Sequence, residues 1–334
     1  MDILLDFAAT FAAQLQKPTL AFLIGGMLIA ALGSQLTIPD PIYRFIVFML
    51  LMTIGLRAGM EIREADLASM VLPGLFALVL GLAIVAAGAA VLTRLPGLKA
   101  DDGYATAGLF GAVSASSLAA AMVVLDEEGI AYEAWAPALY PFMDLPALLA
   151  AIVLAGIARQ RRSPGGARAD IKAIVLDSLR GSAISALLLG MALGLITQPA
   201  GVVEDFYDPM FRGLLSILML ILGMEAWARL SELAKVAHWY ALYASISPIV
   251  HGLAAFALGY VAHVATGFSP GGVVLLAVMA GSSSDISGPP TLRAGIPGAN
   301  PSAYIGASTS IGTPVAIAVG IPLYVALAQL VFDL

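Results

Sequence analysis

The sequence predicts an all-α polytopic membrane protein with ten transmembrane helices, arranged as two inverted five-helix repeats with broken helices four and nine. Three observations carry this prediction. Hydrophobic residues make up 60% of the 334-residue chain and charged residues only 11%, whereas a soluble domain carries roughly 25% charged residues. Ten apolar stretches are long enough to cross a bilayer. The two halves align at one constant offset, with a serine cluster at matching positions.

A spanning helix needs about 20 mostly apolar residues. In chain order, the ten candidate spans are 18–37, 42–60, 68–93, 103–125, 135–157, 178–197, 209–228, 237–263, 271–292 and 303–331. Residues 1–16, before the first span, have the pattern of an amphipathic helix.

Basic residues set the predicted orientation, because Lys and Arg concentrate in short cytoplasmic loops. The loop 158–177 holds five Lys or Arg together with Pro and paired Gly, so it is predicted to be a flexible cytoplasmic loop. Alternating from this loop places twelve basic residues inside and four outside, with both termini outside. The four are Lys17, Arg57, Arg63 and Arg212. Arg57 and Glu225 are expected near membrane boundaries rather than in a reacting site.

An internal repeat divides the chain into 1–157 (spans one to five) and 178–334 (spans six to ten). Three features recur 168 residues apart: the apolar run that ends at Gly55 or Gly223, the serine cluster, and Pro146 or Pro314. The clusters are Ser114-Ala115-Ser116-Ser117 and Ser282-Ser283-Ser284-Asp285. Five spans per repeat is an odd number, so the second half is expected to be inverted, as in many secondary transporters.

Composition also excludes several classes. The formal net charge is −6, so a basic surface for nucleic acid is not expected. The chain has no Cys and three His, which disfavours disulfides, thiolate catalysis and a multi-His metal centre. Neither a Walker motif nor a nucleophile–His–acid set is recognisable. We therefore expect neither an enzyme nor an organic cofactor.

Spans four and nine differ from the plain Leu/Ala/Val helices. Consecutive small polar residues weaken a helix, and Gly288-Pro289-Pro290 removes backbone donors and blocks the preceding turn. A broken helix inside a bilayer is tolerated where it lines a protein cavity. Freed N–H groups attract an anion and freed carbonyls a cation. The alternative is close helix packing through Ser and Gly.

Asp285 is the sharpest feature, because an ionisable residue within a span costs several kcal/mol unless it is paired or solvated. Its neighbours Ser282, Ser283, Ser284 and Ser287 offer only oxygen, which suits a hard cation such as Na⁺. Sodium is therefore the predicted coupling ion, with a proton as the alternative.

Two further groups are candidate cation ligands. Span ten opens with hydroxyls at near-helical spacing, among them Ser308 and Thr309, which either bind a cation or bond back to their own helix. Asp144 in span five is either a second cation ligand or a helix-breaking cap beside Pro146.

These residues resemble the SbtA family of sodium-dependent bicarbonate transporters. The matching strings run from the N-terminus to about residue 330; they include GLFGAVSASSLAAAM, YEAWAPALYPFMDLPAL and SSSDISGPPTLRAGIPGANPSAYIGASTSIGTPVAI. The resemblance implies Na⁺/HCO₃⁻ symport, a homotrimer in the bacterial inner membrane, and a PII-like regulatory partner. It also implies a gate domain of spans one, two, six and seven, and a moving core domain of spans three to five and eight to ten.

The resemblance also implies site residues. Bicarbonate would lie between the serine clusters, at Phe110, Ser114, Ala115, Ser116, Ser117, Ser283, Ser284 and Asp285. Sodium would bind Asp285, Asp144, Ser308 and Thr309. The chain departs from cyanobacterial members, which often carry GAVSGST: here Ala115 replaces a glycine and Ser117 a threonine. The loop between spans five and six is also short, which puts regulation through that loop in question.

The function expected from these observations is an elevator-type symporter that imports HCO₃⁻ with Na⁺. Three rivals remain: a Na⁺-coupled carrier of another small monoanion, a cation/proton antiporter of similar architecture, and a passive channel. An antiporter would favour paired aspartates on one helix, and span nine has one. A channel would not need a cation-binding carboxylate at the break.

Overall fold

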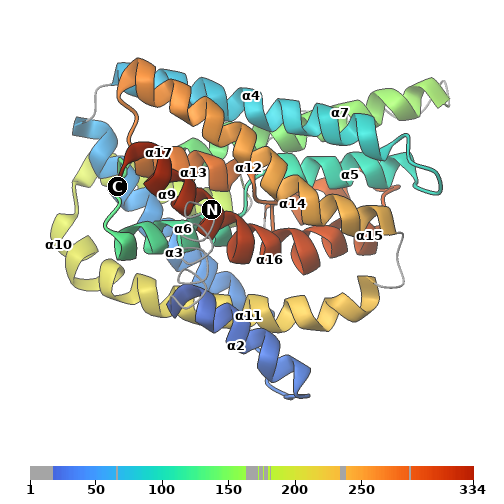
Figure 1. Cartoon of the computed structure of the whole chain (residues 1–334), viewed down its shortest axis with the longest axis horizontal. Coiled ribbons are helices and arrows are strands. Elements are labelled where there is room, and N and C mark those ends of the chain that lie inside the picture. Colours follow the sequence, from blue (N-terminus) through green and yellow to red (C-terminus); the bar gives the residue numbers. More distant parts are fainter. Residues whose placement is uncertain are drawn as a thin grey trace, which may run out of the picture.

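The protein is helical throughout the part that the computed structural model describes, which comprises residues 18–64, 67–162, 172, 176, 180, 182–233, 238–285 and 287–334. No strand occurs among these residues, and Figure 1 shows helices joined by short connections. The all-α prediction is therefore confirmed for the described residues. The predicted amphipathic helix at 1–16 and most of the predicted loop at 158–177 lie outside them.

The described residues of the first half contain six α-helices and one short 3₁₀ helix. These are α2 (Pro18–Ala31), α3 (Asp40–Glu64), α4 (Leu67–Leu92), α5 (Ala100–Gly111), α6 (Ala115–Glu128), η1 (Ala136–Leu139) and α7 (Tyr140–Arg162).

In its described residues, the second half combines α-helices of very different lengths with short π-helical turns. Its elements are α9 (Ser182–Thr197), α10 (Ala200–Val202), the π-turn η2 (Val203–Tyr207), α11 (Asp208–Leu233), α12 (His238–Thr266), α13 (Pro270–Ala280), α14 (Gly288–Gly295), α15 (Pro301–Ala307), the π-turn η3 (Ser308–Gly312), α16 (Thr313–Val315), the π-turn η4 (Ala316–Gly320) and α17 (Ile321–Phe332).

Seven helical stretches in the described residues are long and apolar enough to cross a membrane. They are Pro41–Met60, Ala68–Leu92, Ala100–Glu128, Ala136–Arg159, Ala200–Glu225, His238–Thr266 and Ala303–Val331. Shorter apolar helices occupy the other three predicted spans, at Ala21–Ala31, Ser185–Thr197 and Pro270–Ala280. The prediction of several apolar membrane helices is confirmed, whereas only seven of the ten expected spans reach full length. In span nine the reason is the predicted break, which ends α13 at Ala280.

The helices form three layers. In Figure 1, α4, α7 and α12 lie along one side, α2 and α11 along the opposite side, and α5, α6, α13 and α15–α17 between them. The half-helices α6 and α13 are enclosed. In α13 every residue after Pro270 is buried, and so is α6 from Ala115 to Leu125. The start of α6 at Ala115 and the end of α13 at Ala280 therefore lie inside the molecule.

Two helix pairs outside this centre approach closely through glycine. α2 packs along α11, and α3 packs along α9. A Cβ atom at Gly223 would collide with the carbonyl oxygen of Leu23 on α2, and one at Gly55 would collide with the carbonyl oxygen of Leu187 on α9. The two glycines that the repeat equates therefore have the same role, which is to let one helix backbone approach another.

Gly223→Ala is expected to lower the stability of the folded protein. The new methyl group meets backbone rather than a flexible side chain, so α2 and α11 must separate, at a cost of about 1–3 kcal/mol. Thermal unfolding in detergent measures the effect. Gly213→Ala is the matched control, because Gly213 lies on the same helix and an added Cβ meets nothing within 4 Å. Equal unfolding midpoints for the two variants would contradict the predicted close contact.

Candidate functional site

The break in span four separates α5 from α6 at the first serine cluster. Ala112 and Ser114 have extended backbones, with ψ of 167° and 116°. Ser114 is the N-cap of α6, and its Oγ accepts a hydrogen bond of 3.0 Å from the N–H of Ser117. This local bond explains why a serine cluster starts a new helix here. The other N–H groups in the first turn of α6 face the break.

The break in span nine follows α13 and includes the second serine cluster. The chain leaves the helix at Gly281, and α14 begins at Gly288 with Pro289 in its first turn. The Oγ of Ser284 accepts a hydrogen bond of 2.9 Å from the N–H of Gly288. Breaks at both repeat-equivalent serine clusters confirm the prediction that helices four and nine are interrupted.

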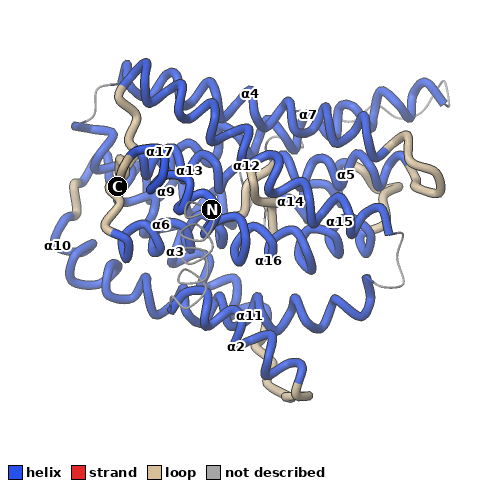
Figure 2. Tube along the Cα trace, viewed as in Figure 1, coloured by secondary structure: helices blue, strands red, loops and turns tan. Residues whose placement is uncertain are grey.

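Three hydrogen bonds join the two breaks directly. The N–H of Ser114 donates to Ser282 Oγ at 2.9 Å, and Ser114 Oγ donates to Asp285 Oδ2 at 3.2 Å. The N–H of Ser284 donates to the carbonyl oxygen of Leu109 at 2.8 Å. Ser114 and Ser282 are the residues that the sequence repeat pairs at an offset of 168. Figure 2 shows loop segments in the middle of the helix stack, where the broken helices are interrupted.

Asp144 on α7 forms hydrogen bonds with both breaks. Its Oδ1 accepts 3.0 Å from the N–H of Val113, and its Oδ2 accepts 3.1 Å from Ser287 Oγ. The carboxylate is fully buried. Ser287 Oγ also lies 2.9 Å from Ser284 Oγ and 3.2 Å from the hydroxyl of Tyr140. Asp144 therefore fixes the relative position of the two break segments.

Span ten contributes a hydroxyl to the second break. Ser308 lies in the π-turn η3 and is fully buried. Its Oγ donates to Ser283 Oγ at 2.9 Å and lies 3.3 Å from the carbonyl oxygen of Ser284. The neighbouring Thr309 donates its hydroxyl to the carbonyl oxygen of Ile305 at 2.8 Å, within its own helix. The sequence left two alternatives for this pair. Ser308 contacts the second break, whereas the hydroxyl of Thr309 bonds back to its own helix.

Phe110 closes the site on the side of α5. Its ring is fully buried and packs edge-to-face on Tyr243 of α12, with ring centroids 5.2 Å apart. Gly312 faces this ring: an added Cβ would lie 2.7 Å from Phe110 Cζ and 2.9 Å from Ser283 Oγ. Because Gly312 has no side chain, it does not fill the space between the Phe110 ring and Ser283.

Several buried oxygen atoms at the breaks and in span ten have no hydrogen-bond partner among the described residues. They are Asp285 Oδ1, Ser116 Oγ, Ser117 Oγ, Ser310 Oγ and Thr313 Oγ1. Buried polar atoms are rarely left unpaired without a reason. A carboxylate oxygen and hydroxyl oxygens suit a hard cation, and hydroxyl protons suit a small anion. The described residues contain no group of three or more His, Cys, Asp or Glu, so the candidate ligands are mainly hydroxyls.

The structure brings most of the predicted site residues together. Ser114, Ser283, Ser284, Asp285 and Ser308 are linked by the hydrogen bonds above. Ala115, Ser116 and Ser117 form the first turn of α6, which begins at the break.

The sequence prediction missed Tyr140 and associated Ser287 with Asp285, whereas Ser287 bonds to Asp144. The spacing of Tyr140 and Asp144, four residues apart on α7, was the available signal, since such residues share a helix face.

One comparison with known proteins identifies the family. The family model of the Na⁺-dependent bicarbonate transporter superfamily matches residues 18–329, nearly the whole chain. A comparison with curated protein sequences found no match. The matched range includes both breaks, Asp144 and the hydroxyls of span ten. The chain therefore belongs to the Na⁺-dependent bicarbonate transporter superfamily.

Proposed function

We propose that this membrane transporter is a secondary active symporter, not an enzyme, that imports HCO₃⁻ with Na⁺ by an elevator-type movement. The observation that carries the proposal is the meeting of two broken helices at Ser114 and Asp285, surrounded by buried oxygens without partners. A transporter needs a site near the middle of the membrane that two ligands can share. The junction of the breaks has the groups that such a site requires.

Sodium is assigned to Asp285, with Ser308, Thr309 and Asp144 as further candidate ligands. Asp285 is only partly buried and uses Oδ2 for Ser114, which leaves Oδ1 for a cation. The carbonyl oxygen of Ser284 lies beside Ser308 and adds an uncharged donor. Oxygen ligands of this kind match the preference of a hard cation.

Bicarbonate is assigned to the start of α6 and the second break, where Phe110, Ser114, Ala115, Ser116, Ser117, Ser283, Ser284 and Asp285 gather. The first N–H groups of a helix attract an anion, and the hydroxyl of Ser117 has no partner among the described residues. An anion here lies close to the Asp285 carboxylate and is repelled by it. A cation on Asp285 removes this repulsion, so each ligand is expected to raise the affinity for the other.

The arrangement of helices supports the inverted-repeat and elevator parts of the proposal. α2 of the first half packs on α11 of the second, and α3 on α9, which is the exchange that a two-fold axis relating the halves would produce. We assign α2, α3, α9 and α11 to the gate domain. The helices α4–α7 and α12–α17, which hold the breaks, form the core domain that would move past it.

Assembly and location follow from the family resemblance and the charge distribution. We propose a homotrimer in the bacterial inner membrane, with both termini outside and the basic segment around 159–172 in the cytoplasm. A PII-like protein is the proposed regulatory partner.

Uptake by reconstituted protein tests the proposed function. An inward Na⁺ gradient across proteoliposomes is expected to drive accumulation of labelled bicarbonate, and a K⁺ gradient is not. Formate, acetate and chloride serve as competitors. Accumulation that ignores the Na⁺ gradient would contradict symport, and accumulation of acetate but not bicarbonate would favour the carrier of another monoanion.

A further inference from the structure

A cavity lies about one helix length from the junction of the breaks. Its volume is about 360 Å³, and it adjoins the C-terminal end of α6, whereas the junction adjoins the N-terminal end. With 14 residues, α6 separates the two by about 20 Å. The lining includes Arg57 of α3, Met122, Leu125 and Asp126 of α6, and Ile130 and Tyr132 of the following loop. We call this cavity the Arg57 pocket.

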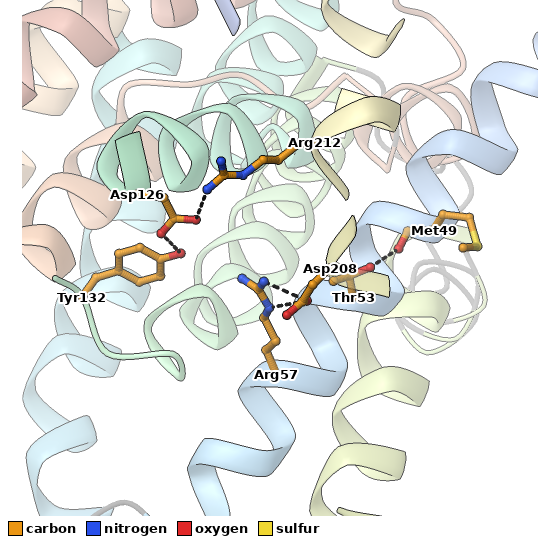
Figure 3. Close-up of polar contacts among 7 residues, drawn as sticks. All are labelled: Met49, Thr53, Arg57, Asp126, Tyr132, Asp208 and Arg212. Atoms are coloured by element: carbon orange, nitrogen blue, oxygen red, sulfur yellow. Dashed lines mark hydrogen bonds and ion pairs between the residues drawn. The ribbon is translucent and has the colours of Figure 1, made fainter. Parts of the chain in front are cut away.

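Arg57 is held in a fixed orientation. Its Nε donates to Asp208 Oδ1 at 2.9 Å, and its Nη2 lies 2.7 Å from the same oxygen. The ring of Phe211 lies 5.9 Å from the guanidinium carbon. Figure 3 shows that the third nitrogen of Arg57 points away from Asp208. Asp208 thus occupies one edge of the guanidinium, and the other edge is available to a second acceptor.

Tyr132 holds the carboxylate of Asp126. Its hydroxyl donates to Asp126 Oδ1 at 3.2 Å, and Asp126 Oδ2 lies 4.0 Å from Arg212 Nη2 (Figure 3). Burial, and next the charge of Asp126, raise the pKa of Tyr132 above its ordinary value. The hydroxyl therefore stays protonated at physiological pH and remains a hydrogen-bond donor.

These features select a particular ligand chemistry. The pocket combines one oriented guanidinium edge and one phenol with mainly apolar walls, which is typical of sites for small ligands. A guanidinium edge binds a planar carboxylate-like group through two parallel hydrogen bonds. The Asp126 carboxylate in the same lining opposes a doubly charged anion. The ligand class is therefore a small, planar, singly charged anion.

We propose that the Arg57 pocket is a separate docking site for a small planar monoanion, with Arg57 as its charged anchor and Tyr132 as a positioning residue that holds the Asp126 carboxylate. Bicarbonate is the expected occupant, an assignment that rests on the proposed function. Formate carries the same planar carboxylate group and is the alternative occupant of the pocket. The pocket lies beside gate helices α3 and α11 and the core helix α6, where an anion would dock before it reaches the junction.

The cysteine-free sequence allows a direct test of occupancy. Ala131→Cys places a single thiol in the lining of the pocket, at an exposed position. The rate of its reaction with a maleimide on an uncharged polyethylene glycol chain is measured in proteoliposomes. Bicarbonate, formate and chloride are compared at equal ionic strength. Bicarbonate is expected to slow labelling several-fold, and chloride to leave the rate unchanged.

Variants of Arg57 and Tyr132 test the assignment. Arg57→Gln is expected to remove the protection and Tyr132→Phe to weaken it. Arg63→Gln is the matched control on the same helix, because Arg63 contacts the carbonyl oxygen of Leu195 instead of the pocket. If Arg57→Gln does not fold, Tyr132→Phe, which keeps the ring and changes only the hydroxyl, decides the question.

Each outcome has one meaning. Protection by bicarbonate that disappears in Arg57→Gln supports the docking site, even if the Na⁺-gradient uptake assay fails and overturns the proposed function. Protection by formate alone would overturn bicarbonate as the occupant. Labelling that no anion slows, or protection that persists in both Arg57→Gln and Tyr132→Phe, would overturn the site itself.

Discussion

Asp285→Asn is expected to abolish Na⁺-driven bicarbonate uptake and to leave the folded protein intact. An asparagine side chain can still accept the hydrogen bond from Ser114 Oγ that Asp285 Oδ2 accepts at 3.2 Å, so the junction of the breaks keeps its geometry. It lacks the negative charge that attracts the cation. We expect the affinity for Na⁺ to fall at least tenfold, which corresponds to about 1.4 kcal/mol.

Two measurements separate binding from folding for this variant. Size-exclusion chromatography and the unfolding midpoint without Na⁺ should match the wild type, whereas the increase of the midpoint with added Na⁺ should disappear. Asp205→Asn is the matched control, because it is the same substitution at an exposed position in η2. Wild-type uptake by Asp285→Asn would remove this carboxylate from the mechanism.

The helix breaks could be predicted from the sequence because their causes are local. Serine clusters compete for backbone hydrogen bonds, and two adjacent prolines prevent a continuous helix through the turn before them but are tolerated in a first turn, where they lie in α14. The repeat added information that neither break provides alone. It equated Ser114 with Ser282, and these residues are joined by a hydrogen bond.

The partners of the charged residues could not be predicted in the same way. Arg57 was expected at a membrane boundary, and its pair with Asp208 joins residues 151 positions apart. Asp144 and Ser287 are 143 positions apart. No local pattern encodes such pairs, since they depend on how α3, α7 and α11 pack in three dimensions. The sequence analysis therefore placed Asp144 near the site but left its role open.

Asp144 joins the two breaks and is also a proposed sodium ligand, and two substitutions distinguish these roles. Asp144→Ala is expected to destabilise the protein and to stop transport. It removes the acceptors of the Val113 N–H and of Ser287 Oγ, both inside the helix stack. A buried donor without a partner costs about 1–3 kcal/mol. Thermal unfolding without Na⁺ should show this loss, and the two break segments should no longer hold their relative position.

Asp144→Asn keeps the shape of the side chain and most of its hydrogen bonding. The amide oxygen can accept from the Val113 N–H, and the amide nitrogen can donate to Ser287 Oγ, whose own proton can turn to Ser284 or Tyr140. Stability without Na⁺ should therefore stay near that of the wild type. The missing charge should raise the Na⁺ concentration for half-maximal uptake several-fold, because Asp144 is a proposed sodium ligand. An unchanged Na⁺ dependence in this variant would restrict Asp144 to joining the breaks, and would assign the sodium charge to Asp285 alone.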